Sequence, residues 1–140
     1  MTIALTKVAY TTAASAKGGR TGHVTSKDGV IDLELAQPSA GAEPKANPET
    51  LFAAGYAACF QGALTNRAKT KGVDASESTV TAEVSFGPSE DGGFGLAVEL
   101  VVAIPGVEPQ QVRELIELAH EFCPYSKATR GNIDVTLTVG

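Results

Sequence analysis

The sequence has few of the residues that mark several large classes of protein. It has no tryptophan, one methionine, two histidines and two cysteines among its 140 residues. A chain of this length buries a core without structural metals or disulfides. No internal repeat, linker or low-complexity tract divides the sequence. We therefore expect a single domain that covers residues 1–140.

Concentrated positive charge is also missing. The formal net charge is −5 and the pI is about 5.0. The densest basic group is the loose set of Arg67, Lys69 and Lys71. Binding to a phosphate backbone needs clustered cations, so a nucleic-acid partner is disfavoured.

Long apolar runs do not occur either. The first residues, MTIALTK, lack a basic segment followed by an apolar one, so we expect no secretory signal. The longest mostly apolar stretch, residues 51–64, is too short and too interrupted to span a bilayer. We expect no membrane association and a cytoplasmic location, where two cysteines would not form a permanent disulfide.

Periodicity and turn signals predict an α+β fold with largely antiparallel strand pairing. Strands are predicted at residues 3–10 (a weakly alternating edge strand), 23–26, 30–36, 79–86, 94–104 and 133–139. The Asp28-Gly29 pair predicts a hairpin turn between the second and third of them. Helices are predicted at residues 47–71 and 109–122, and residues 37–46 are predicted to form a loop.

The first predicted helix has clear start and stop signals. Asn47 can cap its free N–H groups, Pro48 suits the first helical position, and Gly72 is a good stop. Residues 51–64 are apolar or small nearly all round. We therefore expect a central, buried helix whose small residues let another backbone come close.

Cys59 lies in the middle of this helix, and burial in apolar surroundings would raise the pKa of its thiol. Reactivity needs a nearby cation, because lowering that pKa by three units takes roughly 4 kcal/mol. Arg20 and Arg130 are the candidates near the core, although either could be an ordinary surface charge. Glu49 could be a simple helix N-terminal carboxylate, or it could hold an arginine by a bidentate pair.

Glu49 and Cys59 cannot touch within one straight helix, because about ten residues separate them by about 15 Å. An arginine from another segment could bridge part of that distance. A two-fold dimer is a second solution. If two copies of the helix cross antiparallel near Ala54, Glu49 of one chain approaches Cys59 of the other.

Cys123 is predicted to end the second helix, where the negative end of the dipole disfavours a thiolate. That position suits a resolving thiol, which attacks only after a sulfenic acid has formed nearby. His120 has helical spacing to Cys123, but no CxxC or HxxxH pair supports a metal site. We expect no metal, and we expect His120 to be a helix-surface histidine.

Two segments resemble the signatures of the OsmC/Ohr superfamily. They are residues 47–60, NPETLFAAGYAACF, and residues 123–132, CPYSKATRGN. Residues 18–20, GGR, match a third and shorter element, and the order and spacing fit along essentially the whole chain. The second segment is similar to the organic hydroperoxide resistance (Ohr) branch, with only minor departures such as Lys127.

The resemblance implies an OsmC-like fold in an intertwined homodimer with two active sites at the subunit interface. It implies a peroxidase of organic hydroperoxides with Cys59 as peroxidatic and Cys123 as resolving cysteine. Arg20 and Glu49 match the family's activating pair. The implied electron donor is a dithiol, dihydrolipoamide or a lipoylated protein, and no bound cofactor is implied.

Four aromatic side chains near these cysteines are expected to favour bulky alkyl or lipid hydroperoxides over hydrogen peroxide. They are Phe52, Tyr56, Phe60 and Phe122.

Three alternatives to this function stay open. They are an OsmC-type peroxidase of broader substrate range, an acyl-transfer enzyme that uses Cys59 with His120, and a non-catalytic thiol redox sensor.

Overall fold

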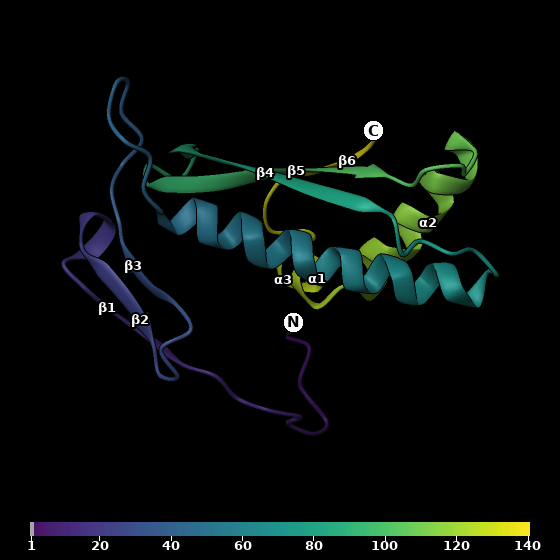
Figure 1. Cartoon of the computed structure of the whole chain (residues 1–140), viewed down its shortest axis with the longest axis horizontal. Coiled ribbons are helices and arrows are strands. Elements are labelled where there is room, and N and C mark those ends of the chain that lie inside the picture. The colour runs from purple at the N-terminus through teal and green to yellow at the C-terminus, as the bar shows by residue number, and fades with distance from the viewer. Residues whose placement is uncertain (1) are drawn as a thin grey trace. The chain divides into compact units, whose positions relative to one another are not determined.

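A computed structural model describes residues 2–140 and divides them into two compact units, one ending at Pro48 and one covering Glu49–Gly140 (Figure 1). The expectation of one domain over the whole chain stays a prediction. Within the described residues, no helix combines the length and apolar character needed to cross a membrane.

The N-terminal unit is a small antiparallel sheet of order β1-β2-β3. Its elements are β1 (Ala14–Lys17), the 3₁₀ turn η1 (Gly19–Thr21), β2 (His23–Ser26) and β3 (Asp32–Glu34). The predicted hairpin turn is confirmed, because Gly29 has a φ of +78° and the Asp28 carboxylate accepts bonds from Ser26 Oγ and the Val30 N–H. An isolated parallel bridge joins Leu35 to Ala46 across the predicted loop.

The prediction of an edge strand at residues 3–10 is wrong. Residues 2–13 form no strand, and large apolar side chains of this segment are exposed to solvent: Ile3, Leu5, Val8 and Tyr10. Weak alternation alone does not make a strand. A strand also needs a neighbour to satisfy its backbone groups, and no pairing is described for this segment.

The C-terminal unit packs helices on a three-stranded sheet of order β4-β5-β6 (Figure 1). Its elements are α1 (Pro48–Thr70), β4 (Thr79–Pro88), β5 (Phe94–Ala103), α2 (Pro109–Phe122), α3 (Pro124–Thr129) and β6 (Val135–Val139). β4 and β5 pair antiparallel, whereas β5 and β6 pair parallel. A parallel pair needs a crossover connection, and here α2 and α3 provide it.

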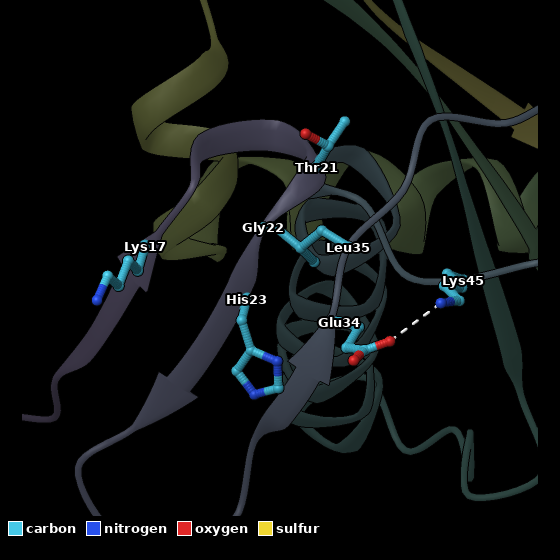
Figure 2. A pocket seen from close by; sticks show the side chains of 7 residues that line it. All are labelled: Lys17, Thr21, Gly22, His23, Glu34, Leu35 and Lys45. Carbon is cyan, nitrogen blue, oxygen red and sulfur yellow. Dashed lines mark hydrogen bonds and ion pairs between the residues drawn. The ribbon is translucent and has the colours of Figure 1, made fainter.

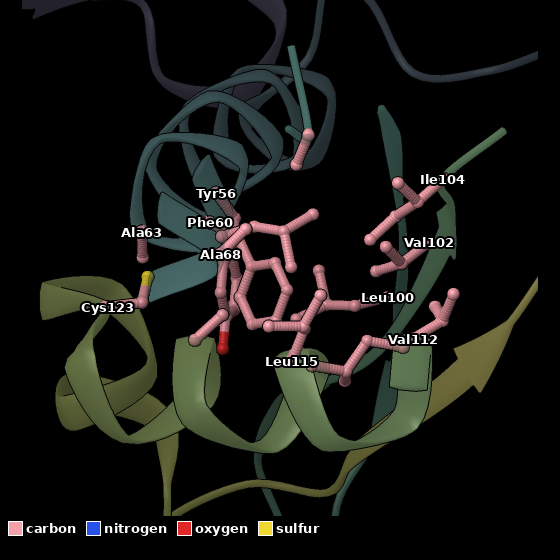
Figure 3. Close-up of a cluster of buried hydrophobic side chains, with 14 of the residues drawn as sticks. Tyr56, Phe60, Ala63, Ala68, Leu100, Val102, Ile104, Val112, Leu115 and Cys123 are labelled. Carbon is pink, nitrogen blue, oxygen red and sulfur yellow. The ribbon is translucent and has the colours of Figure 1, made fainter. Parts of the chain in front are cut away.

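The core of this unit lies between α1, α2 and the sheet (Figure 3). Its largest fully buried apolar side chains are Tyr56, Phe60, Leu64, Leu100, Val102, Leu115 and Ile116. The apolar spacing of α2 buries Val112, Leu115, Ile116 and Ala119, as its sequence pattern predicts. The α+β fold with largely antiparallel pairing is therefore confirmed, while α3, η1 and the parallel pair were not predicted.

The burial expected for α1 holds for one side of the helix. Tyr56, Phe60 and Leu64 are buried, but the small residues Ala54 and Ala58 are exposed. Gly62 continues this exposed row of small residues at helical spacing. A single copy of the chain therefore leaves open the side of α1 on which another backbone could approach closely.

Candidate active site

The two cysteines meet between α1 and the junction of α2 with α3. Both are reduced, and the Cys123 thiol donates to Cys59 Sγ at 3.6 Å. Figure 3 shows the Cys123 side chain pointing from the junction toward α1. A disulfide bond is about 2.05 Å long, so the sulfurs need to approach by only about 1.5 Å to bond.

The position of Cys123 follows from the proline after it. Pro124 disfavours a helical conformation at Cys123, which is extended with φ −65° and ψ 125°. The Cys123 N–H still donates to Ala119 O, while the Ser126 N–H donates to Cys123 Sγ at 3.5 Å. The sulfur thus lies at the end of α2 and at the start of α3. The negative end of the α2 dipole, on which the sequence-based prediction rests, is therefore not the only field at Cys123, because α3 presents its positive end to the same atom.

Burial determines the state of Cys59. The pKa of its thiol is raised, chiefly because burial penalises the thiolate. The Tyr125 backbone N–H bonded to the sulfur lowers the pKa, and the nearby Cys123 thiol raises it. The net direction is upward, so a thiolate at neutral pH needs additional positive charge.

A buried polar cluster lies beside the thiols. Tyr56 Oη is 2.8 Å from Ser126 Oγ and 3.0 Å from Thr129 Oγ1, and Ser126 Oγ is 2.8 Å from His120 Nδ1. Tyr56 and Ser126 are completely buried, and Thr129 is 5% exposed. The expectation that His120 is a plain surface histidine is therefore wrong. Its hydrogen-bond partner comes from α3, a helix that the sequence pattern did not predict.

The surroundings of His120 lower the pKa of its imidazole. Arg130, one of the two cations considered for the thiol, donates from Nη1 to the His120 carbonyl oxygen at 2.7 Å. Burial lowers the pKa of His120 most, the Arg130 charge lowers it further, and Glu121 partly opposes them. His120 Nδ1 bonds Ser126 Oγ, so this nitrogen is engaged away from Cys59.

The four aromatic residues proposed near the substrate have different surroundings. Tyr56 and Phe60 are fully buried in the core, so they can shape a site only indirectly. Phe52 is partly buried, and its ring meets Tyr56 edge-on with centroids 6.0 Å apart. Phe122 is 43% exposed, and the Arg67 guanidinium lies 4.2 Å from its ring centroid.

Tyr125 is a neighbour of the thiols that sequence reasoning missed. Its ring centroid is 6.5 Å from that of Phe52 and 5.9 Å from that of Tyr56, and the residue is 41% exposed. A Cβ at Gly55 would lie 3.2 Å from this ring. Gly55, inside a helix where glycine is otherwise unfavourable, was the available signal for a close approach.

Arg20 and Glu49 belong to different parts of the chain. Arg20 is in η1, in a turn that needs glycine: Gly18 and Gly19 have positive φ, and a Cβ at Gly22 would lie 1.9 Å from Lys17 O. Glu49 is in the first turn of α1. It is therefore about 15 Å from Cys59 along the same helix, as the sequence predicted.

The N-terminal unit also has an open cleft of about 410 Å³ (Figure 2). Its lining comprises Lys17, Thr21, Gly22, His23, Glu34, Leu35 and Lys45. Lys45 Nζ donates to Glu34 at 3.0 Å, and His23 bonds Asp32. The charges are of both signs and are partly paired, so the cleft has no evident selectivity for ions of one sign.

No metal site is evident in the part of the chain that the structure describes. Among residues 2–140, no group of three or more His, Cys, Asp or Glu side chains is arranged to hold an ion. What the described residues do bring together is a pair of reduced thiols beside a hydroxyl cluster. This arrangement can form and break a disulfide.

The family model for OsmC-like proteins matches residues 40–138. The chain therefore belongs to the OsmC family.

Full-length relatives narrow this assignment. The chain is 50% identical to the organic hydroperoxide resistance protein OhrB of Bacillus subtilis, over 91% of this chain and 96% of the relative. It is 47% identical to an organic hydroperoxide resistance protein of Xanthomonas axonopodis pv. citri, over 95% and 96%. The crystal structure of Bacillus subtilis OhrB superposes with a TM-score of 0.89, covering 95% of this chain and 100% of that chain. Within the OsmC family, the chain thus groups with the organic hydroperoxide resistance proteins.

The lowered pKa of His120 predicts how stability changes with pH. Below its ordinary pKa of about 6.5, the unfolded chain binds a proton that the folded chain resists. Stability therefore falls as the pH drops from about 6.5 toward the lower folded pKa. The variant His120→Asn keeps a donor near Ser126 but does not titrate in this range. We expect the wild type to lose stability relative to His120→Asn as the pH falls.

Urea denaturation of both proteins between pH 7.5 and 5 measures this difference. Both proteins contain His23, so the comparison isolates the effect of position 120. A wild type that gains stability relative to His120→Asn in acid would show that the folded pKa is raised instead.

Proposed function

We propose that this chain is a thiol peroxidase that reduces organic hydroperoxides to alcohols. The observation that carries the proposal is the pair of reduced thiols 3.6 Å apart, one on α1 and one at the α2–α3 junction. Relatives that share half of their residues with this chain are organic hydroperoxide resistance proteins, which supports the substrate class.

The proposed reaction has three steps. The Cys59 thiolate attacks one peroxide oxygen, the O–O bond breaks, and the alkoxide leaves and takes a proton to become the alcohol. Cys59 is then a sulfenic acid. The Cys123 thiol condenses with it, which forms the disulfide and releases water. An external dithiol reduces the disulfide by exchange and is itself oxidised to a disulfide.

We further propose that Arg20 stabilises the Cys59 thiolate and the charge on the peroxide oxygens, and that Glu49 orients Arg20. The support is electrostatic. The pKa of Cys59 is raised by burial, so the first step requires a cation that offsets this effect. Arg20 also lies in the segment that resembles the family's short element, on a turn constrained by Gly22.

A homodimer and a dithiol donor complete the proposal. The exposed row of Ala54, Ala58 and Gly62 on α1 supports an antiparallel crossing of two copies near Ala54. Such a crossing would bring Glu49 of one chain near Cys59 of the other. The donor would be dihydrolipoamide or a lipoylated protein, as the resemblance implies, and the protein itself would hold no cofactor.

Substitution of each cysteine tests the two-thiol mechanism. With dihydrolipoamide and an alkyl hydroperoxide, we expect wild type to turn over and Cys59→Ser to lose activity by at least a thousandfold, because the attacking sulfur is gone. Cys123→Ser should stall after one turnover or depend on small thiols. The measurement is peroxide consumption at steady state. Slow disulfide formation without turnover in excess reductant would favour a redox sensor instead.

Substitution of Arg20 tests the proposal that its charge stabilises the Cys59 thiolate. In Arg20→Met, we expect a higher Cys59 thiol pKa and at least a tenfold lower kcat/KM, because the thiolate loses its counter-charge. The pH dependence of Cys59 alkylation in a Cys123→Ser background measures the pKa. Lys45→Met removes a cation of the same unit and serves as the control. Identical alkylation profiles for Arg20→Met and the parent protein would remove Arg20 from the mechanism.

Substrate preference separates this proposal from a peroxidase of broader range. The Tyr125 backbone bonds Cys59, and its partly exposed ring lies 6.5 Å from that of Phe52. With apolar rings next to the residue that bonds the thiol, kcat/KM should be at least tenfold higher for cumene hydroperoxide than for hydrogen peroxide. Phe52→Ala should reduce the value for cumene hydroperoxide while changing that for hydrogen peroxide little. Equal efficiencies in the wild type would favour the broader enzyme.

A further inference from the structure

The buried cluster of Tyr56, Ser126, Thr129 and His120 has no role in the steps above. It joins α1, α2 and α3 directly beside the thiols. Ser126 takes part twice: its side chain bonds Tyr56 and His120, and its backbone N–H donates to Cys123 Sγ. We propose that Ser126 is a positioning residue that keeps Cys123 within reach of Cys59 for the disulfide-forming step. This inference rests on the proposed function.

The donor and the acceptor of each hydrogen bond in the cluster can be assigned one after another, starting from Thr129. Thr129 Oγ1 donates to Ser126 O at 3.3 Å, so its single proton is engaged and it accepts from Tyr56 Oη. Tyr56 has then used its own proton and accepts from Ser126 Oγ, which in turn accepts from His120 Nδ1–H. Every group has a partner, and among the described buried side chains no polar atom is left unsatisfied.

This order makes the chain of bonds insensitive to the charge of His120. Nδ1 carries a proton in the matching neutral tautomer and also in the imidazolium, so it donates to Ser126 in either state. The lowered pKa of His120 favours the neutral form. The cluster therefore supplies a fixed geometry rather than a titrating group.

The need for an anchor comes from the shortness of α3. It has six residues, and an isolated helix of that length does not hold its shape in water. The bonds from Tyr56 to Ser126 and Thr129 attach α3 to the 23-residue helix that carries Cys59. When Ser126 loses its hydroxyl, the α2–α3 junction is held less firmly, and Cys123 spends less time near Cys59.

A loosened junction affects the second step of the reaction far more than the first, to which it contributes only the bond from the Tyr125 N–H to Cys59. Attack by Cys59 on peroxide does not require Cys123, whereas condensation requires an approach of the two sulfurs by about 1.5 Å. A sulfenic acid with a longer lifetime reacts more often with a second peroxide molecule, which oxidises it to the sulfinic acid. The signature of a positioning residue here is slow disulfide formation with normal sulfenic acid formation.

Single-turnover experiments on Ser126→Ala and Tyr56→Phe test this signature. With one equivalent of alkyl hydroperoxide, we expect sulfenic acid formation within about twofold of wild type and disulfide formation at least tenfold slower. At excess peroxide, the sulfinic fraction of Cys59 should rise, as measured by mass spectrometry. The double variant should slow disulfide formation by less than the product of the two single effects, because both substitutions remove the Tyr56–Ser126 bond and each also removes one bond of its own.

Thr138→Val is the matched control. Its hydroxyl donates to Glu99 on the sheet, away from the thiols, so its loss reports general destabilisation without loosening the junction. Normal disulfide formation in both Ser126→Ala and Tyr56→Phe would overturn the proposal. Equal slowing in Thr138→Val would also overturn it.

A second oxidant separates this inference from the proposed function. Diamide forms the Cys59–Cys123 disulfide by intramolecular thiol attack without any peroxide. If wild type does not consume peroxide, the peroxidase proposal fails, yet slower closure in Ser126→Ala with diamide would still support positioning. Equal closure rates with diamide in wild type and Ser126→Ala would refute it.

Discussion

The contact between Cys59 and Cys123 depends on how α1 packs against the α2–α3 junction. Cys59 is in the interior of a long helix and has little freedom to move. Cys123 is placed by the proline that ends α2 and starts α3, and by the core side chains that hold α2 on the sheet. Gly55 lets the Tyr125 ring lie against α1 beside this contact. The contact between the two thiols therefore depends on helix packing rather than on a flexible loop.

The same packing creates an electrostatic difficulty. Burial brings the sulfurs together but raises the pKa of Cys59, and the Tyr125 N–H offsets this only in part. A nucleophile in such a place needs a cation from outside its own helix. Arg20, the cation that we propose, is on a short glycine-constrained turn of the N-terminal unit. Under that proposal, the proximity of the two thiols and the activation of Cys59 would come from separate segments of the chain.

Local signals predicted most of the fold. Asn47 and Pro48 marked the start of α1, Asp28-Gly29 marked the hairpin, and apolar spacing marked α2. The sequence-based predictions were wrong or missing for features that depend on residues far away in the sequence. Residues 3–10 alternate but have no described neighbour, and α3 is too short for a periodic signal. The bonds from Tyr56 to Ser126 and Thr129 span about seventy positions, so no local pattern shows them.

The different requirements of the two thiols explain why a cluster of hydroxyl groups lies around Ser126. Formation of a thiolate at Cys59 is an electrostatic problem, and a neutral chain of hydroxyl groups contributes little to it. In the proposed mechanism, condensation at Cys123 is a problem of distance, for which a satisfied buried network is well suited because it rigidifies its surroundings. An apolar core at the same place would pack α3 without specifying its register. Buried hydroxyl groups at Tyr56, Ser126 and Thr129 therefore fit a junction whose position matters more than its stability.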